Sequence, residues 1–323
     1  MQCRRILGFV LANLGAVMVC TGAATAQPWP ERSVRLILPY APGGATDAIG
    51  RPWADKLGQA LGQPFVIENR GGASGMIGTE AAAKAAPDGY TFLLTPNAPL
   101  AVLPSLRKTP YDPLKNFEPV GRVGDVINGF VIHPSVGVKT FQEMVAYAKK
   151  NPGKLTFASS GSGTSTHLRL EMLKLKAGID ILHVPYRGGA DSLNDVLPGN
   201  VHMMNEPVSL PHAKIGKLIL LNINGSVRHP DFPEVPTLTE LGISGADVPI
   251  WFSVFAPAGT PKPIIAKLNA KIVEIAKTED MQAKMLAVNA VVPLQTPEQM
   301  AAHLAQDIKA NAELIQAANI KLE

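Results

Sequence analysis

Cysteine is almost absent from this chain: its 323 residues contain two, Cys3 and Cys20, both close to the amino terminus. They fall within residues 1–26, which we predict to be a secretory signal peptide. If that segment is cleaved, the mature chain has no thiol. This would exclude disulfides, thiolate metal sites and cysteine nucleophiles.

The signal-peptide prediction depends on an ordered set of features. Two arginines precede an apolar run from Ile6 to about Thr21, and residues 24–26 then have the small-x-small form of a cleavage site. A membrane anchor is disfavoured because the run is short and is interrupted by a polar residue and a glycine. Lipidation at Cys20 is a further alternative, against which the bulky Val19 argues. We therefore expect export to the periplasm.

Charge is sparse and nearly balanced. Removing the two signal-peptide arginines leaves 28 of the 30 basic residues against 26 acidic ones, so the formal net charge falls from +4 to +2. No stripe of Lys and Arg alternates with aromatic residues, which are only 6% of the chain. Nothing therefore supports nucleic-acid binding. No later run is long enough to cross a bilayer, and the remaining length suits two domains.

The sequence is rich in short β-type runs that alternate with helical segments, which predicts an α/β fold with mostly parallel sheets. The continuous apolar character of the runs indicates strands buried on both faces. Thr140 and Thr237 each stand three residues before a glutamate, the spacing of a capping box at a helix start. The predicted strands are Val34–Pro39, Phe65–Asn69, Tyr90–Thr95, Gly129–Pro134, Leu155–Ser159, Ile181–Tyr186, Val201–Asn205 and Leu218–Asn224.

Two segments are predicted to cross between two lobes. One is the Gly- and Val-rich stretch near residues 120–130, and the other is the extended apolar run Val248–Pro257. A chain that leaves one lobe, builds a second and returns needs two such crossings. We therefore expect residues 27–126 plus 250–323 to form lobe 1 and residues 127–249 to form lobe 2.

Two glycine-rich loops, each between a strand and a helix, are the candidate binding elements. In residues 39–47, Gly43 and Gly44 let a ligand approach the backbone, and Thr46 or Asp47 is expected to cap the following helix. The free amides and positive dipole end of such a helix attract an anion. Residues 159–167 add a row of hydroxyl donors. Neither loop contains Arg or Lys. Residues 71–75 are interpreted as a plain turn into the next helix, and the alternative is that they border the cleft.

The signatures of an enzyme are missing. The sequence has no G-x-S-x-G elbow, no H-E-x-x-H pair and no phosphate-binding G-x-x-x-x-G-K-[ST] loop. His167 and Glu171 stand four apart on a predicted helix, but two ligands are too few for a metal. We expect a non-enzymatic protein without a cofactor. A secreted hydrolase using Ser165 or Ser74 is the alternative.

Seven segments in order give the chain a resemblance to a known family. Together they are similar to extracytoplasmic receptors of the tripartite tricarboxylate transporter family, often called Bug proteins, over nearly the whole mature chain. The segments are PYAPGGATD at 39–47, PDGYT at 87–91, YDPLKNFEPV at 111–120, HPSV at 133–136, GKLTFASSGSGTSTHL at 153–168, HVPYRGG at 183–189 and APAGTPKP at 256–263.

The resemblance implies a type II periplasmic-binding-protein fold with an interlobe cleft, a monomer, and membrane permease subunits as partners. It implies a ligand among di- and tricarboxylates, amino acids, nicotinate-like compounds and aromatic acids. A ligand-sensing receptor for a signalling system would use the same fold. Carried over by position, the ligand-binding residues are Tyr40, Gly43, Gly44, Ala45, Thr46, Asp47, Asn97, Ser159, Gly161, Gly163, Thr164, Ser165, His167 and Tyr186.

The chain departs from the family pattern at residues 201–209. Glu206 is expected to replace an aspartate there and to join the ligand-binding residues, and Asp191 stands where a proline is common. Two anion-attracting loops favour a ligand with an acid group at one end and an acceptor-rich group at the other. Glu206 favours instead an amino, amide or hydroxyl group on the ligand. The sequence leaves this choice open.

Overall fold

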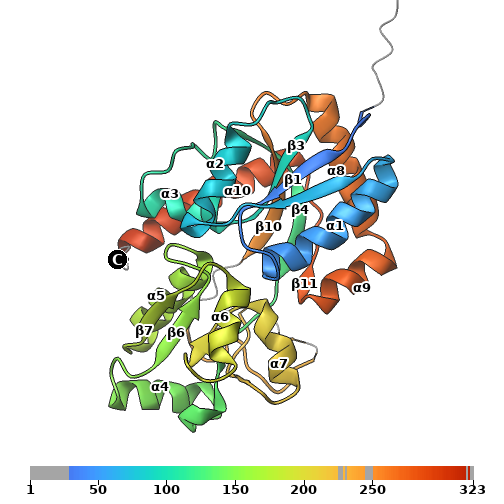
Figure 1. Cartoon of the computed structure of the whole chain (residues 1–323). Helices are drawn as coiled ribbons and strands as arrows, with labels where there is room; N and C mark the ends of the chain where they lie inside the picture. Colours follow the sequence, from blue (N-terminus) through green and yellow to red (C-terminus); the bar gives the residue numbers. More distant parts are fainter. Residues whose placement is uncertain (1–28, 225–227, 230, 244–249, 318, 321–323) are drawn as a thin grey trace, which may run out of the picture.

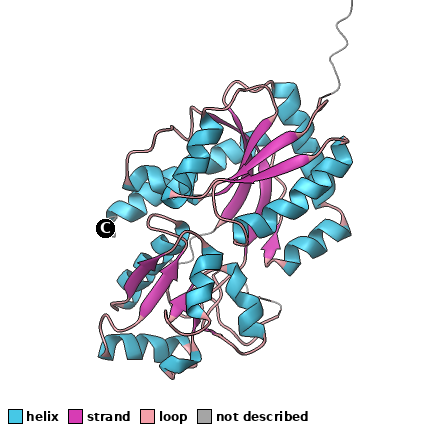
Figure 2. Ribbon diagram, in the orientation of Figure 1, coloured by secondary structure: helices cyan, strands magenta, loops and turns pink. Residues whose placement is uncertain are grey.

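The computed structural model describes residues 29–224, 228–229, 231–243, 250–317 and 319–320. The chain forms two α/β lobes, each with its own sheet and its own buried apolar clusters. Both ends of the chain build lobe 1, whereas its middle third builds lobe 2 (Figure 1). Helices flank both sheets (Figure 2). The α/β prediction is confirmed.

The six-stranded sheet of lobe 1 has the order β11-β4-β10-β3-β1-β2. β1 pairs in parallel with β2 and β3, whereas β10 runs antiparallel to both β3 and β4. The two long strands that connect the lobes therefore lie side by side at the centre of this sheet. Its strands are β1 (Val34–Leu38), β2 (Phe65–Asn69), β3 (Thr91–Pro96), β4 (Phe117–Val126), β10 (Trp251–Pro257) and β11 (Ala290–Val291).

The five-stranded sheet of lobe 2 has the order β7-β6-β8-β5-β9. β6 pairs in parallel with β7 and β8, and β5 is antiparallel to β8 and β9. Both sheets are thus mixed, with three neighbouring parallel strands at one side of each, β3-β1-β2 in lobe 1 and β7-β6-β8 in lobe 2. Four strand pairs are parallel and five are antiparallel, so parallel pairing does not predominate as predicted. The strands are β5 (Val131–Ile132), β6 (Thr156–Ser159), β7 (Leu182–Pro185), β8 (Met203–Met204) and β9 (Ile219–Leu220).

Six α-helices of lobe 1 and four of lobe 2 pack on these sheets within the described residues. α10 contributes to two clusters: Met300 and Leu304 pack in a cluster of lobe 1, and Ile315 packs in a cluster made mainly of lobe 2 residues. The helices are α1 (Ala45–Leu61), α2 (Met76–Ala83), α3 (Leu103–Leu106), α4 (Phe141–Lys150), α5 (Ser165–Ala177), α6 (Gly189–Val196), α7 (Leu210–Lys214), α8 (Lys262–Ala276), α9 (Glu279–Ala287) and α10 (Pro297–Ala317).

Two local predictions are wrong. β2 and β7 are edge strands with a single neighbour each, so Val66 is 52% and Leu182 is 56% exposed and these two strands are not buried on both faces. Thr237 and Glu240 do make the reciprocal capping-box hydrogen bonds, but the segment is a turn and no helix continues from it.

The first crossing between the lobes lies at residues 127–128. The Ile127 amide donates to the Asn289 carbonyl of lobe 1, and Asn128 forms an antiparallel bridge with Asn224 of lobe 2. Of the second predicted crossing, Val248–Pro257, residues 251–257 form β10 of the lobe 1 sheet, and residues 248–249 lie outside the described residues.

Candidate ligand-binding site

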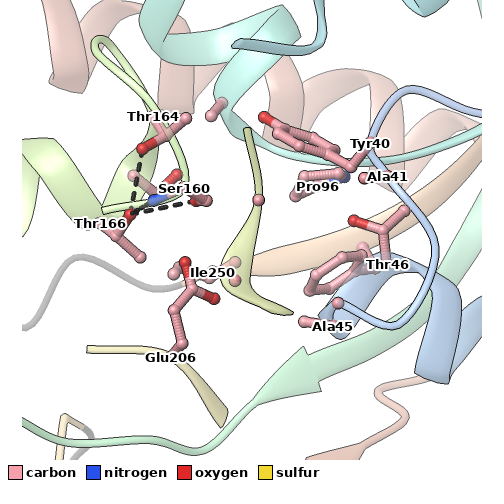
Figure 3. A pocket seen from close by; sticks show the side chains of 16 residues that line it. Tyr40, Ala41, Ala45, Thr46, Pro96, Ser160, Thr164, Thr166, Glu206 and Ile250 are labelled. Atoms are coloured by element: carbon pink, nitrogen blue, oxygen red, sulfur yellow. Dashed lines mark hydrogen bonds between the residues drawn. The ribbon is translucent and has the colours of Figure 1, made fainter. Parts of the chain in front are cut away.

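A cavity lies between the lobes, and both lobes line it. Figure 3 shows Tyr40, Ala45 and Thr46 of lobe 1 on one side and Thr164, Thr166 and Glu206 of lobe 2 facing them. The cavity is small, with a volume of about 40 Å³. Its lining residues are Tyr40, Ala41, Gly44, Ala45, Thr46, Pro96, Ala98, Ser160, Thr164, Ser165, Thr166, Gly188, Gly189, Glu206, Ile250 and Phe252.

The start of α1 forms the lobe 1 side of the cavity. Its N-cap is Gly44, in an extended conformation and without a side-chain cap. The expectation that Thr46 or Asp47 would cap the helix is wrong, because both already lie within its first turn. The first-turn amides of an α-helix have no partner inside the helix. The backbone of Ala45 and Thr46 therefore offers donors at the edge of the cavity.

Asp47 shapes this loop from behind and does not line the cavity. Its carboxylate accepts hydrogen bonds from the Gly43 amide at 3.1 Å, from Asn69 at 3.2 Å and from Arg51 at 2.7 and 2.9 Å. Burial alone would raise the pKa of Asp47, but these hydrogen bonds outweigh it and hold the pKa below its ordinary value. The ionised carboxylate fixes Gly43 in a left-handed turn with a φ of +83°.

Two hydrogen bonds between side chains of one lobe and the loop of the other close the cavity. Ser74 donates to the Ser162 carbonyl at 2.6 Å, and Ser165 donates to Asn97 at 2.8 Å. Gly161 is required at the first contact, because a Cβ there would lie 2.8 Å from the Ser74 hydroxyl. Loop 71–75 therefore borders the cleft, which was the lesser alternative from the sequence.

The start of α5 forms the lobe 2 side, and its loop is held by its own side chains. Thr164 is the N-cap and accepts from the His167 amide, while its hydroxyl donates to the Gly161 carbonyl at 2.7 Å. Thr166 accepts from the Ser160 amide at 3.2 Å. Figure 3 draws the contacts that link Thr166 to Thr164 and Ser160. The loop is thus built to keep its shape when empty.

Two stacked imidazoles support this loop from below. The rings of His167 and His183 lie 4.0 Å apart at 13°, and the Gly163 amide donates to His167 Nδ1 at 3.1 Å. Ser159 contacts His183 Nε2 at 2.6 Å. Burial lowers the pKa of His167 to about 4, with a smaller contribution from Lys174. His167 is therefore neutral at physiological pH and serves as an acceptor for the loop.

A third helix start, which the sequence analysis did not identify, borders the cavity. Gly188, the N-cap of α6, and Gly189, its first residue, both line it. The glycine pair was visible in the HVPYRGG segment, but only Tyr186 was selected from that segment. Tyr186 lies away from the lining and donates to Asp195 at 2.6 Å. Three helix N-termini thus meet at one cavity, which favours an anion there.

Glu206 is the only charged residue among the described residues that line the cavity. It follows β8, is 5% exposed, and packs so closely under α6 that a Cβ on Gly189 would lie 3.1 Å from its Oε2. Its Oε1 is buried without a hydrogen-bond partner in the described part of the chain. Burial raises the pKa of Glu206 to about 7, although hydrogen bonds from Ser160 and Thr166 and the positive charge of Arg169 partly oppose the rise.

The residues selected from the sequence divide into two sets. The first set lines the cavity, and the second supports the loops or the lobe contact from behind it; the roles of both in binding stay predictions. The cavity-lining set is Tyr40, Gly44, Ala45, Thr46, Thr164, Ser165 and Glu206. The supporting set is Gly43, Asp47, Asn97, Ser159, Gly161, Gly163, His167 and Tyr186.

The described residues contain neither a metal-ligand cluster nor a membrane-spanning helix. No three His, Cys, Asp or Glu side chains there are grouped to hold a metal ion. No helix there has both the length and the apolar character needed to cross a membrane. Two lobes with a cavity between them are the architecture of a solute-binding protein.

The family follows from comparison with known proteins. The sequence profile described as the tripartite tricarboxylate transporter family receptor matches residues 49–320, so the chain belongs to this family of periplasmic solute receptors. The chain is 37% identical to Protein BugT of Bordetella pertussis over 97% of its own length and 98% of the relative's. The predicted family is confirmed, and it is a family of binding proteins, not of enzymes.

Solved structures agree with this assignment. A structure of a periplasmic transporter is 35% identical, with a TM-score of 0.89 over 91% of this chain and all of the other. A Rhodopseudomonas palustris protein solved with adipate is 33% identical, with a TM-score of 0.87 over 91% of this chain and 99% of the other. MatC of the same organism, with bound malate, is 30% identical, with a TM-score of 0.84 over 89% of this chain and all of the other.

Proposed function

We propose that this protein captures a small carboxylate between its lobes and delivers it to the membrane subunits of a tripartite tricarboxylate transporter. The observation that carries the proposal is the meeting of three helix N-termini, those of α1, α5 and α6, at the interlobe cavity. Each contributes amides without intrahelical partners and the positive end of a dipole. That structures of two relatives contain adipate and malate is in keeping with it.

The ligand carboxylate fits best against the start of α1. The amides of Ala45 and Thr46 supply donors there, and across the cavity the start of α5 supplies the positive end of its dipole. No Lys or Arg lines the described cavity, so the carboxylate is held by dipoles and hydrogen bonds, not by an ion pair. Charge-assisted hydrogen bonds of this kind contribute about 1.5–3 kcal/mol each.

Binding is expected to be coupled to closure of the lobes. The α1 loop and the α5 loop belong to different lobes, so only a closed arrangement lets one ligand contact both. A ligand that binds the closed form better shifts the population towards it. The hydrogen bonds of Ser74 and Ser165 across the cleft stabilise the same closed form.

A thermal-shift screen of the mature chain against carboxylic acids tests the proposal. An acid present at 100 times its Kd should stabilise the folded chain by about 2.7 kcal/mol, a shift in Tm that is easily seen. The matched controls are the primary amides of the same acids, which lack the negative charge. If amides or neutral sugars stabilise the chain and acids do not, the proposal is wrong.

A further inference from the structure

Glu206 has no function in a site that only needs to hold a carboxylate. The helix starts that line the cavity offer amide donors and positive dipole ends, whereas Glu206 brings a carboxyl group. The side chain is almost fully buried, and its Oε1 has no partner in the described residues. An unpartnered buried acceptor is unfavourable, because the hydration lost on burial is not replaced. A ligand group that donates a hydrogen bond to Oε1 would relieve this cost.

The position of Glu206 is fixed by its surroundings. Gly189 has no side chain, so the carboxyl group packs directly against the backbone at the start of α6. The side chains of Ser160 and Thr166 hydrogen-bond to the carboxyl group. The cation whose charge acts on it is the buried Arg169, whose guanidinium already donates to Asn128 and Asn205. The carboxyl group therefore faces the cavity without an ion-pair partner of its own.

We propose that Glu206 makes this receptor selective for carboxylic acids that also carry a hydrogen-bond donor, an ammonium or a hydroxyl group, over plain diacids of the same length. The inference rests on the proposed function and names the ligand class of the same cavity. The ligand carboxylate occupies the starts of α1 and α5, and its donor group contacts Glu206. A plain diacid would instead bring its second carboxylate towards Glu206, where like charges repel.

The affinity test uses matched acids and isothermal calorimetry on the mature chain. One pair is succinate and 4-aminobutyrate, the second is adipate and 6-aminohexanoate, and malate and aspartate add a donor to succinate. In at least one comparison the donor-bearing acid should bind about ten- to a hundredfold more tightly than the diacid without a donor, the value of one charge-assisted hydrogen bond.

Substituting Glu206 tests whether its side chain causes the preference for donor-bearing acids. In Glu206→Gln the preference should fall to less than about threefold, because the amide is neutral and donates as well as accepts. The control is Glu274→Gln, at a glutamate of α8 whose side chain is 64% exposed and remote from the cavity. It should leave all affinities unchanged.

The pH dependence of the wild-type chain gives a second readout, which does not require the variant to fold. Only ionised Glu206 attracts an ammonium group, so the affinity for 4-aminobutyrate or 6-aminohexanoate should fall about tenfold from pH 8 to pH 6, as a group with a pKa of about 7 takes up its proton. The groups around Glu206 keep their charge states in this pH range: Tyr40 and His167 are neutral, and the guanidinium of Arg169 is charged. Asp191 of α6 lies exposed to solvent. The affinity for a plain diacid should change in the opposite direction.

The outcomes separate this inference from the proposed function. If plain diacids bind at least as tightly as every donor-bearing acid, and Glu206→Gln or the change of pH does not alter the order, the selectivity inference is wrong while the carboxylate receptor stands. If no acid of the set or of the wider screen binds, the proposed function fails and the inference fails with it.

Discussion

The loop before α1 and the loop before α5 both lead a strand into a helix at the cavity, but their hydrogen bonds are distributed differently. In the α1 loop a single carboxylate, Asp47, ties the turn from behind, and the helix start carries no side-chain cap. In the α5 loop, hydroxyls and an imidazole satisfy one backbone group after another, with Thr164 as the cap.

The difference indicates that the two loops contribute to the site in different ways. The α1 loop leaves its backbone donors available, so what matters there is the absence of side-chain atoms. The α5 loop is held by its own side chains, so its hydroxyls have fixed positions. Substitutions that add atoms should therefore be harmful in the α1 loop, and substitutions that remove hydrogen bonds should be harmful in the α5 loop.

The largest effect is expected from Gly44→Val. The Gly44 Cβ would point across the cleft to the Gly189 amide, 3.7 Å away, so branched methyl groups would fill the space between the two helix starts. Carboxylate affinity measured by calorimetry should fall more than about a hundredfold, the loss of two charge-assisted hydrogen bonds. Gly44→Ala, whose single Cβ fits at ordinary contact distance, should lose much less. Equal affinity in wild type and Gly44→Val would remove the α1 loop from the site.

An intermediate effect is expected at His167, which should make the stability of the α5 loop depend on pH. Its pKa is about 4 in the folded chain and about 6.5 in the unfolded chain, so the unfolded state binds the proton more strongly. Stability is then complete above pH 6.5 and is lost as the pH falls towards 4.

Urea unfolding of wild type and His167→Gln measures this effect. Between pH 7 and pH 5 the wild type should lose about 2 kcal/mol more than the variant, from linkage at this one site. The variant cannot take up that proton, and its amide oxygen can still accept from Gly163. Parallel stability curves for the two proteins would show that the imidazole is not held neutral by the fold.

The smallest effect is expected from Ser74→Ala, which removes one hydrogen bond between lobe 1 and the α5 loop. A neutral hydrogen bond contributes about 0.5–1.5 kcal/mol, so ligand affinity should fall about three- to tenfold. Small-angle scattering should show a larger radius of gyration for the ligand-free variant than for wild type, and a decrease when ligand is added. Ser33→Ala, at an exposed serine of lobe 1, is the control. An unchanged radius and affinity would mean that this bond does not stabilise closure.

Much of the fold was predictable because its signals are local. The alternation of apolar runs and helix starts predicted eight strands, and all eight positions contain at least a short strand of the structure. The glycine pairs at residues 43–44 and the hydroxyl-rich residues 159–167 were recognisable because close backbone approach and helix capping are properties of short segments. Burial of β2 and β7 was mispredicted, because the residues of a strand do not show whether it has one neighbour or two.

The sequence by itself determined the fold class, the family and the two loops that hold anion-attracting helix starts, because each depends on residues adjacent in the chain. Three-dimensional packing added α6 as a third helix start, placed Ser74 against Ser162, and left Oε1 of Glu206 buried without a partner among the residues that the structure describes. These features join residues between 17 and 88 positions apart, Glu206 with Gly189 and Ser74 with Ser162. Their distances are set by how the two sheets and their helices pack, which no short segment encodes.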